Sequence, residues 1–192
     1  VRTKDYLKLL GLLAHEYFHT WFVKRIKPAE LVDASFDVEV PTRLLWLFEG
    51  FTSYYDNFML RRTGLASDAE YAAMLTEDVK YVMGNAAHRV QTLAEASFDA
   101  WIKYYKPSAN TANAHVSYYR QGALAALTLN AVILQKTKGK KSLDDVMRLF
   151  WADFKEAGED YGGVGEEDVS DVIERATGLD LTELLTTLTE TT

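Results

Sequence analysis

Four polar residues stand out in a segment that is otherwise apolar. Residues 9–23 read LLGLLAHEYFHTWFV, and the apolar run is interrupted only by His15, Glu16, His19 and Thr20. A helix that is apolar nearly all round belongs in an interior, where imidazoles and a carboxylate each need a partner. A spacing of four residues places two side chains about 40° apart around a helix and about 6 Å apart along its axis. His15 and His19 therefore share one face, as two ligands of a single metal ion do.

The acidic residue between the histidines has a different position on the helix. Glu16 lies about 100° round from His15, so it is not placed to be a third ligand from the same turn. It can instead reach a metal-bound water as a general base, which is the arrangement of the His-Glu-x-x-His zinc signature. The alternative is a pair of buried histidines bonded to backbone carbonyls, with a separate partner for each ring. Because one ion satisfies both imidazoles at once, the sequence predicts one Zn²⁺ per chain.

A catalytic zinc site also needs a third protein ligand and an open position for water. The chain has no cysteine, and Phe22 and Arg25 stand where the metzincin pattern requires glycine and histidine. A carboxylate remains, and Glu49 is a lone acid in the apolar run LLWLFEGF, where an unpaired charge is costly. We therefore predict coordination by Glu49. The alternatives are acids of a predicted loop, namely Glu30, Asp33, Asp37 and Glu39.

Polar residues continue along the predicted helix beyond Glu49. Thr52 and Ser53 lie one turn further on, and Asp56 lies a further turn on. In these positions they are candidates to hydrogen-bond to a ligand carboxylate or imidazole. Ordinary helix packing is the alternative for all three.

The elements that must position these residues are nearly all helical. Apolar spacings of three and four recur along the chain, and strand-like alternation is confined to residues 35–40. Capping residues, prolines and glycines predict helices over residues 4–25, 43–62, 67–83, 90–105, 116–137, 142–156, 166–176 and 181–188. We expect a mainly α, multi-helix array with little or no sheet, forming one domain over residues 1–192. Its first two helices carry the metal site.

Composition excludes several classes of function. The 192 residues carry a net charge of −7 without any basic block, so the electrostatic footprint of a nucleic-acid or membrane-surface protein is missing. Apolar runs end well short of the about 18 residues that span a bilayer, and no signal-like N-terminus appears. We expect a soluble protein, with the cytoplasm slightly favoured over a secreted or periplasmic location. Because Val1 opens almost directly into a helical pattern, we also expect a piece of a longer protein.

Several stretches resemble the glycyl aminopeptidase family of zinc metallopeptidases, peptidase family M61, a relative of aminopeptidase N within the gluzincin clan. They are HEYFHTW at 15–21, VKRIKP at 23–28, LWLFEGFTSYY at 45–55, LAEASFDAW at 93–101, SYYRQG at 117–122 and SLDDVMR at 142–148. Together they reach across most of the chain. Such spread is far more specific than the zinc motif alone.

The resemblance implies roles for individual residues. The zinc site it implies consists of His15, His19 and Glu49 as ligands and Glu16 as the base that activates water. Tyr119 falls on the tyrosine of the family's Tyr-x-Lys-Gly motif, which implies a hydrogen bond from its hydroxyl to the tetrahedral oxyanion, with Tyr118 as the alternative. A phenol in that role contributes a few kcal/mol to the transition state. His115 precedes Tyr119 by four residues, so on the predicted helix 116–137 it would approach the same face and the substrate.

The chain departs from the family pattern at two positions. Gln121 stands where the motif has lysine, which removes a positive charge near the proposed oxyanion site. Phe22 stands where the family often carries asparagine, and neither position is a proposed ligand.

The resemblance further implies a fold and an activity. The fold is the helical lobe of a thermolysin-like catalytic domain, preceded in longer relatives by β-rich regions and often followed by a PDZ-like domain. The activity is release of small N-terminal residues, Gly or Ala, from a peptide by attack of a zinc-bound water. We expect this isolated piece to bind zinc better than it cleaves peptides. The alternative is a non-catalytic helical binding module whose zinc site is structural or vestigial.

Overall fold

The computed structural model describes residues 3–35 and 37–192 of the chain. These residues form helices and connecting loops without a sheet, and their isolated β-bridges join Phe22 to Ile26 and Pro28 to Val164. The strand-like segment 35–40 forms no strand in its described part, and Phe36 lies outside the described residues. The expected mainly α, multi-helix array is therefore confirmed. In the described ranges, no helix combines the length and the apolar character needed to cross a bilayer.

Most of the predicted helices appear close to their predicted bounds. The α-helices are α1 (Lys4–Phe18), α2 (Leu45–Arg62), α3 (Asp68–Gly84), α4 (Leu93–Phe98), α5 (Thr111–Ala114), α6 (Tyr118–Lys136), α7 (Leu143–Ala157), α8 (Glu166–Thr177) and α9 (Thr182–Glu190). The short 3-10 turns are η1 (Ala29–Leu31), η2 (Ala86–Arg89) and η4 (Gly158–Asp160), and η3 (Ala100–Tyr104) is a π-helix. Several starts follow from capping residues; for example, Ser67 accepts the backbone N–H of Glu70 at the start of α3.

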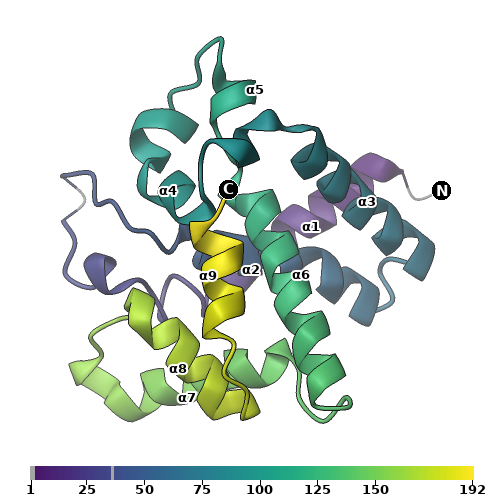
Figure 1. The fold of residues 1–192 in the computed structure, drawn as a ribbon. Coiled ribbons are helices and arrows are strands. Elements are labelled where there is room, and N and C mark those ends of the chain that lie inside the picture. The colour runs from purple at the N-terminus through teal and green to yellow at the C-terminus, as the bar shows by residue number, and fades with distance from the viewer. Residues whose placement is uncertain (1–2, 36) are drawn as a thin grey trace.

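Helices α2 and α6 form the centre of the molecule, with α1 and α3 at one end and α7 and α8 at the other (Figure 1). Their backbones approach most closely at two glycines. A Cβ added to Gly50 would lie 2.5 Å from Cα of Gly122, and one added to Gly122 would lie 2.6 Å from the carbonyl oxygen of Trp46. No side chain fits at this contact, so the glycines permit the close packing of α2 on α6.

The first predicted helix, residues 4–25, is wrong at its end. Helix α1 stops at Phe18, and the chain reverses in a compact turn in which the N–H of Ile26 donates to the carbonyl of Trp21. The reversal buries Phe22 completely, with its ring stacked on that of Phe48 at 4.5 Å between centroids. In this turn Val23 has a φ of 113°, a backbone conformation that is unfavourable for a β-branched residue. Burial in the core therefore overrides the helical pattern.

The predicted helix over 90–105 is also wrong, because two shorter elements replace it. A capping box between Thr92 and Glu95 starts α4 at Leu93, and α4 ends at Phe98. In the following π-helix the backbone N–H of Tyr105 donates to the carbonyl of Ala100 at 3.1 Å. In this wider turn, the ring of the preceding residue, Tyr104, packs against Tyr118 and Tyr119 at the start of α6.

Candidate metal centre

Two imidazoles and one carboxylate meet where α1 packs on α2. Nε2 of His15 and Nε2 of His19 each lie 3.2 Å from the same oxygen, Oε2 of Glu49. One donor atom from each of the three residues lies within 4.8 Å of the other two. In the described part of the chain, no other group of three or more His, Asp or Glu side chains has this arrangement. His19 reaches the site from the C-cap of α1, so the early end of the helix keeps both rings together.

The outer nitrogens of both rings are occupied, which determines what the inner nitrogens can do. Nδ1 of His15 lies 3.1 Å from Oδ2 of Asp56, and Nδ1 of His19 lies 2.9 Å from the carbonyl oxygen of Phe22. Both acceptors lack a proton, so we assign the Nδ1–H tautomer to each neutral ring. The Nε2 lone pairs then face the Glu49 oxygen. Three acceptors that face one another need a cation or protons between them, and a set of two nitrogens and one oxygen suits Zn²⁺.

The pKa shifts of the three residues also favour positive charge between them. Burial lowers the pKa of His15, but hydrogen bonds and charges from Asp56 and Glu49 outweigh it and raise the pKa to about 9. Burial also lowers the pKa of His19, but the hydrogen bond and charge of Glu49 outweigh burial, so the pKa of His19 is raised as well. For Glu49 itself, burial raises the pKa, but the two histidines lower it to about 2. The carboxylate therefore stays charged and attracts cations.

Only one of the three polar residues that follow Glu49 contacts a proposed ligand. Asp56 does so through His15, and burial raises its pKa against the opposing effect of that hydrogen bond. Thr52 is fully buried and donates its hydroxyl to the carbonyl of Phe48 within its own helix. Ser53 makes no side-chain hydrogen bond to any described residue. Neither Thr52 nor Ser53 therefore hydrogen-bonds to a proposed ligand among the described residues, and the alternative, ordinary helix packing, fits the buried Thr52.

The four alternative acids of the loop stay apart from the two histidines. Glu30 accepts a hydrogen bond from Thr42 at 3.2 Å, and Asp37 accepts one from Ser35 at 3.1 Å. Glu39 pairs with a lysine at 3.8 Å. Neither these three nor Asp33 joins the group that Glu49 completes.

The proposed base, Glu16, is exposed on α1 between the two histidines. Its carboxylate forms no ion pair or hydrogen bond with the described residues. A carboxylate without a competing partner is free to accept a proton from a water molecule that approaches the histidines.

Tyrosines at the start of α6 adjoin the metal group. The ring of Tyr119 lies 6.1 Å from that of His15, whereas Tyr118 is fully buried. Burial raises the pKa of both phenols, so both remain protonated and able to donate at neutral pH. The hydroxyl of Tyr119 lies 3.2 Å from that of Tyr105, and the hydroxyl of Tyr118 lies 3.3 Å from it. Sequence reasoning missed Tyr105, because its position depends on the π-helix, for which the sequence carries no recognisable signal.

The structure places His115 away from this group. Helix α6 begins at Tyr118, and His115 stands in extended conformation after α5. Its Nδ1 is buried without a hydrogen-bond partner among the described residues, and its carbonyl accepts from Asn85 at 3.1 Å. The expected helix face shared with Tyr119 is therefore wrong, because the helix starts after His115.

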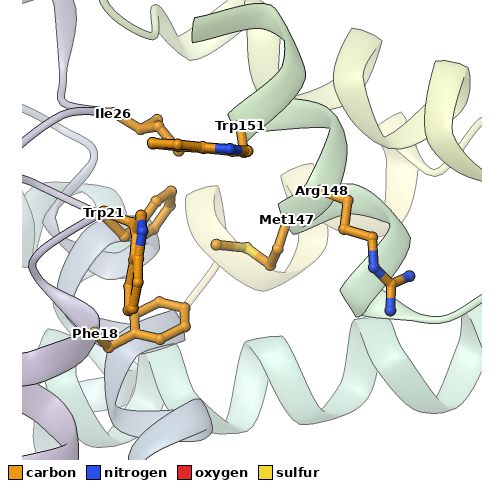
Figure 2. Close-up of a pocket in the computed structure, with 7 residues that line it drawn as sticks. Phe18, Trp21, Ile26, Met147, Arg148 and Trp151 are labelled. Carbon is orange, nitrogen blue, oxygen red and sulfur yellow. The ribbon is translucent and has the colours of Figure 1, made fainter. Parts of the chain in front are cut away.

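Two pockets border this region. The first, of about 340 Å³, has Glu49 in its wall and is otherwise lined mostly by apolar and aromatic side chains, namely Leu31, Val40, Thr42, Leu45, Ser97, Ala100, Trp101, Tyr105 and Tyr118. The second, of about 230 Å³, lies between residues 18–26 and α7, with the rings of Trp21 and Trp151 on two of its sides (Figure 2). It contains no proposed ligand. Of these two pockets, only the first has a proposed ligand in its wall.

Two comparisons with known proteins found matches for this chain. A family model described as M61 glycyl aminopeptidase matches residues 8–125. A crystal structure of an aminopeptidase N family protein from Idiomarina loihiensis superposes with a TM-score of 0.92 at 31% sequence identity. The match covers 100% of this chain and 32% of that one, so this chain spans about a third of that protein's length. No curated protein matches the sequence.

Proposed function

Because the chain belongs to the M61 glycyl aminopeptidase family, we propose that it carries the zinc site of a metallopeptidase. The observation that carries this proposal is the convergence of two imidazole nitrogens, from His15 and His19, on one oxygen of Glu49. Two histidines and a glutamate, with a fourth position open, form a common catalytic zinc site. When bound, zinc lowers the pKa of a coordinated water and polarises a carbonyl group.

The surrounding residues supply the rest of the chemistry. Asp56 and the Phe22 carbonyl hold the outer nitrogens of the two rings, which fixes their tautomers and orientations. Glu16 takes a proton from the attacking water and returns it to the leaving amine. Tyr119 donates a hydrogen bond to the carbonyl oxygen as negative charge develops there.

The proposed substrate is a peptide, from which small N-terminal residues, Gly or Ala, are released. The family description and the resemblance in the site motifs support this class of substrate. The apolar pocket beside Glu49 offers space for one side chain next to the scissile bond.

The test compares zinc content with hydrolysis of glycyl- and alanyl-anilides by the natural protein that contains this chain. We expect about one zinc per chain and a rate that a chelator abolishes. Glu16→Gln should keep the zinc and lose about 100-fold or more of kcat, the usual contribution of a general base. Zinc without chelator-sensitive hydrolysis would instead support a non-catalytic binding module.

A further inference from the structure

Three tyrosine hydroxyls form a chain that ends beside the metal group. The hydroxyl of Tyr118 donates to that of Tyr105 at 3.3 Å, and the hydroxyl of Tyr105 lies 3.2 Å from that of Tyr119. Tyr105 is therefore bonded to both of the others, which also interact directly with each other. These distances are long for O–H···O bonds, as is common in catalytic groups before substrate tightens them.

The number of protons limits this chain to two possible directions. Each phenol has one proton to donate and lone pairs that accept. The hydroxyl proton of Tyr118 is donated to the oxygen of Tyr105. If Tyr105 donates to Tyr119, the proton of Tyr119 is left for a third group. The opposite order would direct the Tyr119 proton at Tyr105 and away from the substrate.

We propose that Tyr105 is a positioning residue that accepts from Tyr118, donates to Tyr119 and thereby directs the Tyr119 hydroxyl proton toward the reacting carbonyl oxygen. This inference rests on the proposed function, in which Tyr119 is the donor to that oxygen. Successive hydrogen bonds of one direction polarise each other, so the last donor in the chain is strengthened.

The local backbone is consistent with this role. The π-helix Ala100–Tyr104 comes immediately before Tyr105, and its closing bond runs from the N–H of Tyr105 to the carbonyl of Ala100. A π-turn adds one residue, which rotates the residues after it by about 100° relative to a continued α-helix. Such turns occur frequently at functional sites. Here the turn brings a residue from outside α6 against two tyrosines of α6.

The effect of Tyr105→Phe on stability must be separated from its effect on catalysis. The Tyr105 side chain is exposed, with the residue at 55% of its full accessible area, so loss of one oxygen leaves no cavity. Because Tyr105→Phe also removes the acceptor of the buried Tyr118 hydroxyl, we expect a modest loss of stability, and all variants are assayed well below their unfolding temperatures. Tyr6→Phe is the matched control, since Tyr6 is similarly exposed on α1 and its hydroxyl makes no hydrogen bond with any described residue.

The decisive experiment is a double-mutant cycle in the zinc-loaded natural protein, with Tyr105→Phe, Tyr119→Phe and the double variant. We expect Tyr105→Phe to lower kcat by about fivefold to tenfold, the range of one hydrogen bond, with KM within about twofold. In the Tyr119→Phe background the same change should cost less than about twofold, because the two residues act as a unit. An equal loss in both backgrounds, a loss confined to KM, or no loss would overturn the proposal.

A binding measurement separates this proposal from the proposed function. The probe is a phosphinate analogue of a glycyl dipeptide, whose tetrahedral anion imitates the charge that develops during hydrolysis. We expect Tyr105→Phe to weaken its binding by about fivefold with Tyr119 present and by less than about twofold without it. If the wild type binds the probe but hydrolyses no peptide, the proposed function fails while this cycle still decides the role of Tyr105. Binding that Tyr105→Phe leaves unchanged, or no binding of the probe to the zinc-loaded wild type, would overturn the role.

Discussion

The carboxylate of Asp56 lies 3.1 Å from Nδ1 of His15, whereas the other nitrogen of the same ring faces Glu49. The ring is thus held from both sides by α2. An imidazole held in this way presents one fixed nitrogen to a metal ion and donates more strongly to it.

Replacement of the outer partner should weaken the site without removing a ligand. We expect Asp56→Asn to lower zinc affinity by about 10-fold to 100-fold, the usual cost of losing such a partner. Competition with a fluorescent chelator measures the change. Asp68→Asn is the control, since Asp68 is exposed and pairs with Arg61. Equal affinities in the Asp56 variant and the wild type would show that His15 needs no support from α2.

Removal of a ligand should have a larger effect. His19→Ala and Glu49→Ala each leave two protein ligands where a catalytic site has three. Elemental analysis of the purified proteins should show zinc falling from about one per chain to below about 0.2. The matched control is His88→Ala, because His88 lies in η2 and is not part of the metal group. Full zinc occupancy in either ligand variant would exclude that residue from the coordination sphere.

Zinc affinity should rise with pH. In the metal-free chain the pKa of His15 is raised to about 9, and that of His19 is also raised. At pH 7 zinc must therefore displace a proton from His15, and this competition weakens as the pH approaches 9. We expect the apparent affinity to increase by about tenfold per pH unit for each proton released between pH 6 and 8. Isothermal titration calorimetry in two buffers of different ionisation enthalpy counts the protons. No proton release at pH 7 would contradict the hydrogen-bonding scheme of the site.

The close contact of α2 with α6 predicts a sharp effect on stability. Gly122→Ala places a methyl group 2.6 Å from the Trp46 carbonyl, and overpacking of this kind costs about 1–3 kcal/mol or more. Gly84→Ala, at the end of α3, meets no atom within 4 Å and should be neutral or stabilise by up to about 1 kcal/mol. Urea unfolding of the two variants gives the comparison. Similar midpoints for the two proteins would mean that the helices move apart easily.

Part of the site could be predicted from the sequence because it follows from helical spacing. His15 and His19 lie four residues apart on one helix, and Glu49 is a lone charge in an apolar run. The structure brings these three together. Helical phase alone was less reliable for the residues beyond Glu49, where Asp56 contacts His15 but Thr52 bonds to its own helix.

Other features depend on tertiary contacts that no local pattern reveals. Helix α1 ends at Phe18 because the chain turns to bury Phe22 and Ile26, although the sequence there continues a helical pattern. Tyr105 reaches Tyr119 because a π-helix replaces an α-helix whose sequence looks regular.

The glycine contact has a further consequence for the proposed chemistry. Gly50 directly follows the proposed ligand Glu49, and Gly122 comes three residues after Tyr119. Backbone touches backbone at this point, so main-chain atoms set the distance between the Cα atoms from which the Glu49 and Tyr119 side chains extend. We therefore expect a methyl group at either glycine to push α2 and α6 apart and to change the distance between these two side chains, even in a protein that still folds.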